Sequence, residues 1–356
     1  MNNTEVIIYL ENIRYNLRNI KKKIDKTEII AVIKGDAYSH GILEVARICI
    51  EEGIKKFCVG SLEEAILLRE NGIEAQTILL LLPPNKENID DIIKYNISPT
   101  VYKLEHLYLI KNKNINLPFE IEIDTGIGRS GCREEKFYNI INYIKINKMN
   151  LKAIYTHLYN KDNYDDCIKQ LNEFKSYKCC IKDVKYHIGG AYALCYGKDF
   201  LLDELRVGIG MYGLANMTLA GCNLKPALEL NSKICDIINI NKGQRIGYNK
   251  NEFVFKRDSR LALLNFGYSN GYPSIEKNIV KVKNQFCEIV GGINMMNCCI
   301  DITDVKDVNI GDWVNIYSID SEDMNSILQL SRINDIKPGK FIYGLNQSYF
   351  ERKYIL

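Results

Sequence analysis

The chain has 356 residues, 46% of them hydrophobic, which is enough to bury one large core or two medium ones. Its 47 basic and 44 acidic residues leave a net charge of +3, so no global field points to nucleic acid or to an anionic membrane, and we expect a small-molecule partner. The longest apolar run, residues 78–84, is too short to span a bilayer, and the N-terminus lacks a basic leader. We therefore expect a cytoplasmic protein.

The first part of the chain, to about residue 213, alternates short strand-like runs with stretches of helical spacing. This alternation is typical of parallel strands joined by crossover helices, and eight strands can close into a barrel. An open doubly wound sheet is the alternative, but no GxGxxG follows the first strand. The predicted strands are 28–33, 57–60, 77–82, 97–102, 119–124, 151–157, 184–188 and 205–211, with helices at 42–49, 62–68, 137–144 and 167–174.

After about residue 223 the sequence pattern changes to short β-branched and aromatic runs separated by Asn, Gly, Lys and Asp. The clearest runs are 260–265, 279–282, 286–290 and 313–317. The predicted fold class is therefore α/β plus β. An N-terminal (β/α)8 TIM barrel over residues 1–223 is followed by a mostly β domain over residues 224–356.

The twelve cysteines do not indicate a disulfide framework. The pairs Cys179-Cys180 and Cys298-Cys299 lie among apolar residues, and no C-x-x-C pair occurs. We expect reduced thiols, most of them in the core. The four histidines have no metal-ligand spacing, so no metal site is predicted.

Catalytic groups of a TIM barrel lie at the C-terminal ends of its strands. Lys34 directly follows the first predicted strand, in the segment AVIKGDAYSHG. A lysine at a strand end is commonly no more than a solvated surface group. Its glycine and aromatic neighbours favour a functional site.

AVIKGDAYSHG resembles the motif with which alanine racemases hold pyridoxal phosphate. Further matches follow in the family's order and cover nearly the whole chain. The resemblance implies a pyridoxal-phosphate-dependent racemase acting on a small amino acid, alanine or serine. The matching segments are DTGIGRSG (124–131), Tyr155-Thr156-His157, RVGIGMYGL (206–214), GYSNGYP (267–273) and the methionine-containing loop (293–303).

Racemisation needs proton removal on one face of the substrate and proton delivery on the other, with an electron sink for the carbanion. By resemblance, Lys34 binds the cofactor aldehyde and then serves as one base, and Tyr268 is the opposite base. A free tyrosine has a pKa of about 10, so it needs nearby positive charge. The family arrangement implies a chain from Tyr268 through His157 to Arg206.

The resemblance also implies the cofactor contacts. Arg206 would donate to the pyridine nitrogen, and Tyr38 with the backbone of Gly208 and Ile209 would hold the phosphate. A C-terminal tyrosine also contacts the phosphate in the family. The segment YGLNQSYFERKY aligns in more than one register, and Tyr349 is chosen.

Two residues are implied in substrate binding. Arg129 resembles the arginine that contacts the substrate carboxylate, although a loop arginine is otherwise usually solvated. The Met295 backbone N–H would receive the same carboxylate. Met295 and Tyr268 would come from a second subunit, which implies an obligate head-to-tail homodimer with shared active sites. The remaining histidines, His40, His106 and His187, are interpreted as local hydrogen-bonding groups.

Four positions depart from the family pattern. Glu122 replaces a lysine that is often carbamylated, and it supplies a carboxylate that could orient Arg129 without carbon dioxide, or simply face another base inside the barrel. Met296 replaces an aspartate, Gly292 an arginine and Ala191 a phosphate-binding serine. These changes suggest an altered substrate preference, for which the soluble half of vancomycin-type serine/alanine racemases is a candidate relative.

Two other functions remain open at this point. Pyridoxal-phosphate decarboxylases of basic amino acids share the barrel-plus-β architecture, but the GYSNGYP tyrosine and the MYGL segment favour the racemase. A non-catalytic pyridoxal-phosphate-binding protein is the second alternative. Such proteins are usually lone barrels, and the additional β domain disfavours this function.

Overall fold

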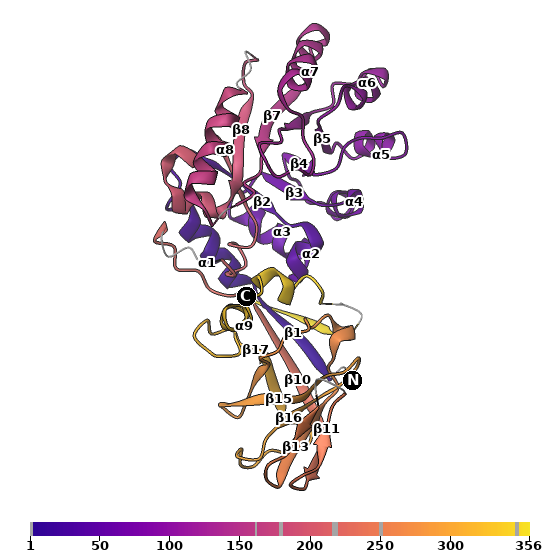
Figure 1. Cartoon of the computed structure of the whole chain (residues 1–356). Helices are drawn as coiled ribbons and strands as arrows, with labels where there is room; N and C mark the ends of the chain where they lie inside the picture. The colour runs from indigo at the N-terminus through magenta and orange to yellow at the C-terminus, as the bar shows by residue number, and fades with distance from the viewer. Residues whose placement is uncertain (1–2, 161, 178–180, 216–219, 249–251, 346–348) are drawn as a thin grey trace.

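The computed structural model describes residues 3–160, 162–177, 181–215, 220–248, 252–345 and 349–356. Two bodies follow one another along an elongated molecule, a helix-covered barrel and a β domain (Figure 1). The predicted fold class, a TIM barrel followed by a mostly β domain, is confirmed.

The barrel has eight parallel strands that pair in chain order, and the last strand returns to pair with the first. The barrel is closed, so the open-sheet alternative is wrong. All eight predicted strands are present, each within a few residues of its predicted bounds. They are β2 (Glu28–Val32), β3 (Lys56–Val59), β4 (Thr77–Leu80), β5 (Ser98–Val101), β6 (Phe119–Glu122), β7 (Leu151–Thr156), β8 (Lys185–Gly190) and β9 (Glu204–Val207).

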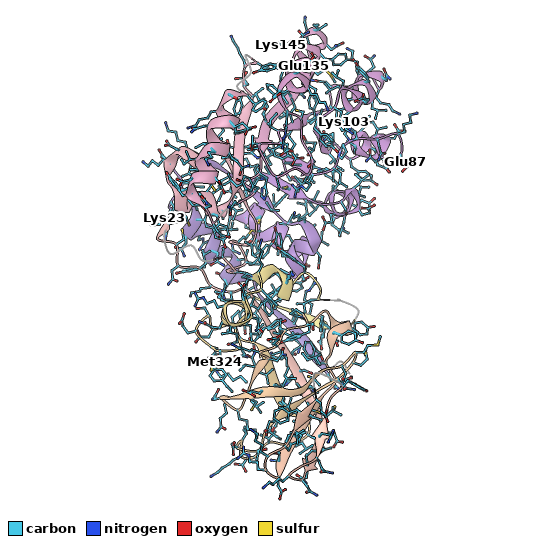
Figure 2. The ribbon with its side chains drawn as sticks, viewed as in Figure 1. Lys23, Glu87, Lys103, Glu135, Lys145 and Met324 are labelled. Carbon is cyan, nitrogen blue, oxygen red and sulfur yellow. The ribbon has the colours of Figure 1, made fainter. Side chains whose placement is uncertain are left out.

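Helices surround the barrel and bury one apolar side each. In α7 the buried residues Phe137, Ile140, Ile141 and Ile144 recur at intervals of three and four, the spacing of one helical face. Charged side chains of α7 such as Glu135 and Lys145, labelled in Figure 2, are exposed. The covering helices are α1 (Leu10–Lys21), α3 (Ile42–Glu51), α4 (Leu62–Glu70), α5 (Ile89–Lys94), α6 (Leu104–Asn112), α7 (Glu134–Asn147) and α8 (Tyr164–Ser176).

The second domain is built on an eight-stranded sheet in the order β13-β16-β15-β14-β17-β10-β1-β18. Its pairs are antiparallel except that between β1 and β18. The four strands predicted here are present, and α9 (Ile327–Asn334) lies beside them. The strands are β10 (Leu228–Ile240), β13 (Ser259–Leu264), β14 (Ile279–Val282), β15 (Gln285–Ile293), β16 (Cys298–Asp301), β17 (Trp313–Tyr317) and β18 (Glu351–Ile355), with a short β11 (Arg245–Ile246) and β12 (Phe253–Val254) hairpin beside them.

Strand β1 (Thr4–Tyr9) requires a correction to the expected domain division, which placed it with the barrel. It lies in the sheet of the β domain, where Val6 is paired with Leu230 of β10 on one side and with Arg352 of β18 on the other. The chain therefore starts in the β domain, crosses into the barrel and returns. These pairings join residues more than 200 positions apart, so no local pattern could predict them.

The ten cysteines in the described ranges are all unpaired, and most are buried. Cys298 and Cys299 lie in β16, whereas Cys179 and Cys180 lie outside the described residues. No helix in the described part of the chain combines the length and the apolar character that a bilayer-spanning helix needs.

Candidate active site

Lys34 lies at the C-terminal end of barrel strand β2 and opens α2 (Lys34–Ser39). This element is a left-handed turn, because every residue from Gly35 to Ser39 has a positive φ between 51° and 65°. Residues with a Cβ adopt that conformation at a cost, so the surrounding structure has to hold it.

Hydrogen bonds from three directions hold the turn at Asp36. Its backbone N–H donates to Glu64 Oε1 at 3.0 Å, and its carboxylate accepts from the Ile42 N–H at 2.9 Å. The Arg352 guanidinium lies 2.7 Å from the same carboxylate. Since Arg352 belongs to β18, the β domain helps to fix the lysine-bearing turn of the barrel.

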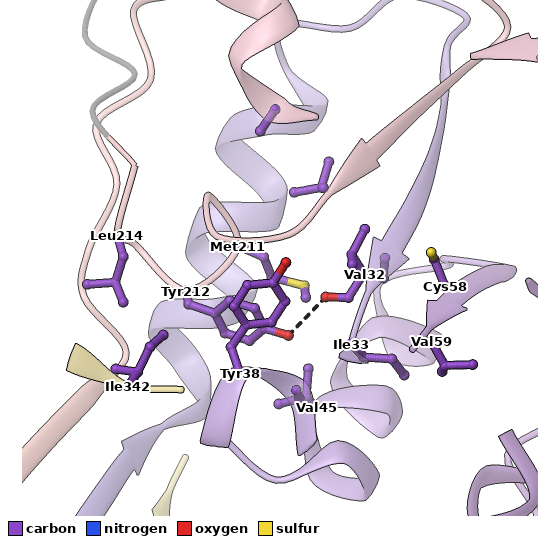
Figure 3. Close-up of a cluster of buried hydrophobic side chains, with 14 of the residues drawn as sticks. Val32, Ile33, Tyr38, Val45, Cys58, Val59, Met211, Tyr212, Leu214 and Ile342 are labelled. Carbon is purple, nitrogen blue, oxygen red and sulfur yellow. Dashed lines mark hydrogen bonds between the residues drawn. The ribbon is translucent and has the colours of Figure 1, made fainter. Parts of the chain in front are cut away.

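Tyr38 and Gly208 approach each other closely beside this turn. A Cβ placed on Gly208 would lie 2.8 Å from the Tyr38 hydroxyl oxygen, so glycine is required for this approach. Tyr38 packs against Tyr212, with ring centroids 5.0 Å apart, and Tyr212 donates to the Val32 carbonyl at 3.2 Å (Figure 3). Burial raises the pKa of Tyr38, so its phenol stays protonated and can donate.

The C-terminal tyrosine beside Tyr38 is Tyr343, which sequence reasoning did not choose. Its ring centroid lies 5.2 Å from that of Tyr38, with an interplanar angle of 56°. Tyr349 is 39% exposed and makes no hydrogen bond or ring contact with Tyr38 among the described residues. The register of YGLNQSYFERKY could be resolved only by folding, because several of its alignments are equivalent in sequence.

Arg206 is buried between two histidines. Its Nη2 donates to the Thr156 carbonyl at 2.6 Å and to His157 Nδ1 at 3.3 Å, and its Nη1 donates to His187 Nδ1. Burial and the Arg206 charge lower the pKa of His157 to about 3, and burial lowers that of His187 to about 3. Both rings are therefore neutral acceptors, whereas the guanidinium remains charged.

Below Arg206 the barrel interior holds a buried ionic cluster that the sequence analysis missed. His187, interpreted there as a local hydrogen-bonding group, lies 2.9 Å from Glu120, which also contacts Lys56. Lys56 is 2.8 Å from Glu204. The strict alternation in the strand FEIE, which turns Glu120 and Glu122 to the same side, is the signal that could have revealed the cluster.

Glu122 faces Arg129, the residue predicted to bind the substrate carboxylate. The Arg129 Nη2 lies 3.6 Å from Glu122 Oε1, and Ser130 Oγ donates to Glu122 Oε2 at 2.6 Å. The Glu122 carboxylate is buried, whereas the Arg129 side chain is 61% exposed. The structure thus brings together the two residues that the departure from the family pattern had linked.

Tyr268 and Met295 lie together in the β domain. The Tyr268 N–H donates to the Asn294 carbonyl, and the Ser269 N–H to the Met295 carbonyl, both at 3.0 Å. Tyr268 is 56% exposed and Met295 58% exposed. Among the described residues no hydrogen bond or ion pair joins Tyr268 to Lys34 or His157, so one chain does not assemble the predicted base pair by direct contact.

The structure also locates the three other positions that depart from the family pattern. Ala191 is buried at the start of the 3-10 helix η1 (Ala191–Tyr196). Gly292 lies near the end of β15. Ser269 Oγ lies 2.7 Å from the Met295 carbonyl, to which it donates, and 2.8 Å from the Met296 sulfur.

The fold and the polar groups at the strand ends define a two-domain barrel enzyme with an amine, Lys34, at the C-terminal end of a strand. Residues 8–216 match the alanine racemase N-terminal domain family, and residues 227–352 match the alanine racemase C-terminal domain family. The chain belongs to the alanine racemase family, whose members are isomerases. This assignment favours a racemase over a decarboxylase or a lone binding barrel.

Individual relatives agree with this assignment. The alanine racemase of Clostridium kluyveri is 33% identical over 326 residues, which span 86% of this chain and 83% of the relative. The structure of Bartonella henselae alanine racemase with covalently bound pyridoxal phosphate is 26% identical, with a TM-score of 0.89 and 99% coverage of each chain. The Clostridium difficile alanine racemase complex with cycloserine is 27% identical, with a TM-score of 0.87, and the match covers 100% of this chain and 96% of that one.

Proposed function

We propose that this protein interconverts L- and D-alanine with pyridoxal phosphate as its cofactor, and that Lys34 and Tyr268 act as opposed bases. The observation that carries the proposal is the placement of Lys34 beside the Tyr38–Gly208 contact. Strands β2 and β9 are neighbours, so Lys34 and Gly208 follow the ends of adjacent strands. An amine thus lies beside groups suited to a phosphate.

The residues at the strand ends fit pyridoxal phosphate. Lys34 is an exposed amine, and Gly60 leaves room for its stem, since a Cβ there would lie 3.2 Å from Lys34 Cβ. Tyr38 supplies a protonated phenol, and Arg206 a buried guanidinium. When bound, the cofactor would supply the electron sink that makes loss of the substrate α-hydrogen accessible. The relative from Bartonella henselae carries this cofactor covalently.

The roles in cofactor binding, proton transfer and substrate binding are assigned to different residues of this chain. Lys34 would hold the cofactor covalently and, once released, move a proton on one face of the substrate. Tyr38, Tyr343 and the Gly208–Ile209 backbone would bind the phosphate. Arg206 would donate to the pyridine nitrogen, and as a permanently charged donor it would keep that nitrogen unprotonated. Arg129 would bind the substrate carboxylate.

Tyr268 would reach the site of a second subunit. Its exposure together with Met295 supports a head-to-tail homodimer in which each site combines Lys34 of one copy with Tyr268 of the other. Tyr349, which was chosen from the sequence as the C-terminal phosphate ligand, has less support than Tyr343, because Tyr343 is the neighbour of Tyr38. Unpaired cysteines are consistent with a cytoplasmic location.

The function is tested with purified protein, pyridoxal phosphate and L-alanine in deuterated water. We expect loss of optical rotation and exchange of the α-hydrogen, and L-serine in a parallel reaction measures whether the hydroxymethyl side chain is accepted. No exchange with either amino acid would reject the proposal. Release of carbon dioxide would instead indicate a decarboxylase.

The shared site is tested by mixing two inactive variants, Lys34→Ala and Tyr268→Phe. Random exchange of subunits makes half of the dimers mixed, and each mixed dimer has one site with both bases. We expect recovery of about one quarter of the wild-type activity. No recovery under conditions in which subunits do exchange would mean that both bases come from the same chain.

A further inference from the structure

The ionic cluster beneath Arg206 consists of inward-facing side chains from four strands, β3, β6, β8 and β9. His187 Nε2 lies 2.9 Å from Glu120 Oε2, while His187 Nδ1 accepts from Arg206. The His187 ring is also stacked on Tyr155, with centroids 4.9 Å apart and an interplanar angle of 10°. Glu120 and His187 are both fully buried.

These contacts determine the tautomer of His187. A carboxylate only accepts, so the ring must carry its proton on Nε2 to bond Glu120. A neutral imidazole with its proton on Nε2 presents a lone pair on Nδ1, which is what the Arg206 N–H needs. The opposite tautomer would set an N–H against the Arg206 N–H and a lone pair against the Glu120 carboxylate.

The charges around His187 balance without a charge on its ring. Arg206 and the nearly buried Lys56 are the cations, and Glu120 and Glu204 are the buried carboxylates. At the edge of the cluster Lys185 lies 3.5 Å from Glu204 and 2.8 Å from Glu28, which adds one charge of each sign. Burial alone would raise the pKa of Glu120, but Lys56 and the His187 N–H hold it at about 2. The ligand atoms of Glu120, His187 and Glu204 lie within 4.8 Å of one another, and the Lys56 ammonium supplies the positive charge that a metal ion would bring there.

We propose that Glu120 is a positioning residue for Arg206. It holds the His187 proton on Nε2, and His187 Nδ1 in turn fixes the guanidinium on the side opposite His157. The functional part of this inference rests on the proposed role of Arg206 at the pyridine nitrogen. Its structural part, the tautomer of His187, does not depend on the cofactor.

Glu204 offers a matched control. It carries the same charge, belongs to the same cluster and contacts the same Lys56, but its carboxylate lies 3.7 Å from His187 Nε2, beyond hydrogen-bond distance. Glu204→Gln therefore removes one buried charge and leaves the Glu120–His187 bond. Glu120→Met removes both the charge and the acceptor, whereas Glu120→Gln removes the charge and keeps an acceptor oxygen.

The tautomer is read directly by nitrogen NMR of protein labelled at its histidine rings, with and without pyridoxal phosphate. Only four histidines contribute, and loss of one set of signals in His187→Gln assigns His187. We expect the proton on Nε2 in the wild type and in Glu204→Gln. In Glu120→Met the Arg206 N–H still occupies Nδ1, but Nε2–H loses its acceptor, so the His187 Nε2 resonance should move. An unchanged Nε2 resonance in Glu120→Met, or the same change in Glu204→Gln, would overturn the proposal.

A second comparison covers the case in which Glu120→Met does not fold. In Glu120→Gln a neutral amide replaces a charged acceptor, so the His187 Nε2 resonance should move, whereas Glu204→Gln should leave it in place. If the resonance moves in both variants or in neither, Glu120 has no specific part in holding the ring.

The effect of Glu120 on the position of Arg206 is measured through the affinity for pyridoxal phosphate. We expect Glu120→Met to weaken pyridoxal phosphate binding by about tenfold, as for the loss of one buried hydrogen-bond acceptor, and to change the pH profile of the absorbance of the lysine-bound cofactor. Glu204→Gln should change the affinity by less than about threefold. Equal weakening in the two variants would refute positioning through His187. A wild-type protein with the expected tautomer but no affinity for the cofactor would refute the proposed function instead.

Discussion

The Glu122 carboxylate lies 3.6 Å from the Arg129 guanidinium and accepts a hydrogen bond from the Ser130 hydroxyl. The family resemblance places a carbamylated lysine at this position, and Glu122 supplies a carboxylate there without carbon dioxide. The carboxylate is buried and the arginine is exposed, so Glu122 limits the directions in which Arg129 can point.

Glu122→Gln should therefore raise the KM for alanine by about three- to tenfold and change kcat less, because a partly exposed ion pair contributes about 1 kcal/mol. Steady-state kinetics in both directions measure this change. Added bicarbonate should alter neither constant of the wild type. Activation of the wild type by bicarbonate, or an unchanged KM in the variant, would show that Glu122 does not orient Arg129.

Tyr268→Phe should separate the two faces of the reaction. Removal of a general base typically costs about 10² to 10⁴ in rate, so α-hydrogen exchange should nearly stop for one enantiomer of alanine while Lys34 continues to exchange the other. Proton NMR in deuterated water follows each enantiomer separately. Tyr248→Phe, a change at another exposed tyrosine of the same domain, is the control. Equal losses for both enantiomers would count against a two-base reaction.

Substitution of Tyr343 and substitution of Tyr349 should have different effects on cofactor affinity. The Tyr343 ring lies 5.2 Å from that of Tyr38, and we propose that its hydroxyl binds the phosphate, so Tyr343→Phe should weaken pyridoxal phosphate binding by about three- to tenfold, the effect of one hydrogen bond. Tyr349→Phe should have little effect, because Tyr349 makes no contact with Tyr38 among the described residues. Fluorescence titration of the two variants decides between them, and the reverse order would restore Tyr349 as the phosphate ligand.

Stability should fall as the pH drops below the histidine range. Burial lowers the pKa of His157 and of His187 to about 3, and that of His40 to about 4, from an ordinary value of 6.5. Between these values the unfolded chain binds more protons than the folded one, so the free energy of unfolding decreases with falling pH. Each such histidine contributes at most about 1.4 kcal/mol per pH unit.

Urea denaturation at about pH 8, 6.5 and 5 tests this prediction. The midpoint should change little between the upper two values and fall clearly between the lower two. Glu120, whose pKa is lowered to about 2, loses its contribution only at more acidic pH, so it does not interfere. A constant midpoint down to pH 5 would mean that the buried rings are charged in the folded protein.

The sequence alone was sufficient to identify features that depend on neighbouring residues. The eight barrel strands and the helices α3, α4, α7 and α8 follow from apolar runs and helical spacing within windows of about ten to twenty residues. The position of Lys34 at a strand end follows from the same local pattern. The order of the motifs then indicated the family, to which the chain belongs.

Only the tertiary structure decided which distant residues meet. The pairing of β1 with β10 and β18, the choice of Tyr343 beside Tyr38, and the chain from Arg206 through His187 to Glu120 all join separate segments. Local propensity carries no information about such contacts, because their free energy is gained only when strand closure brings the segments together. The sequence by itself therefore determined the elements and the chemistry available at their ends, and the closed barrel decided how that chemistry is positioned.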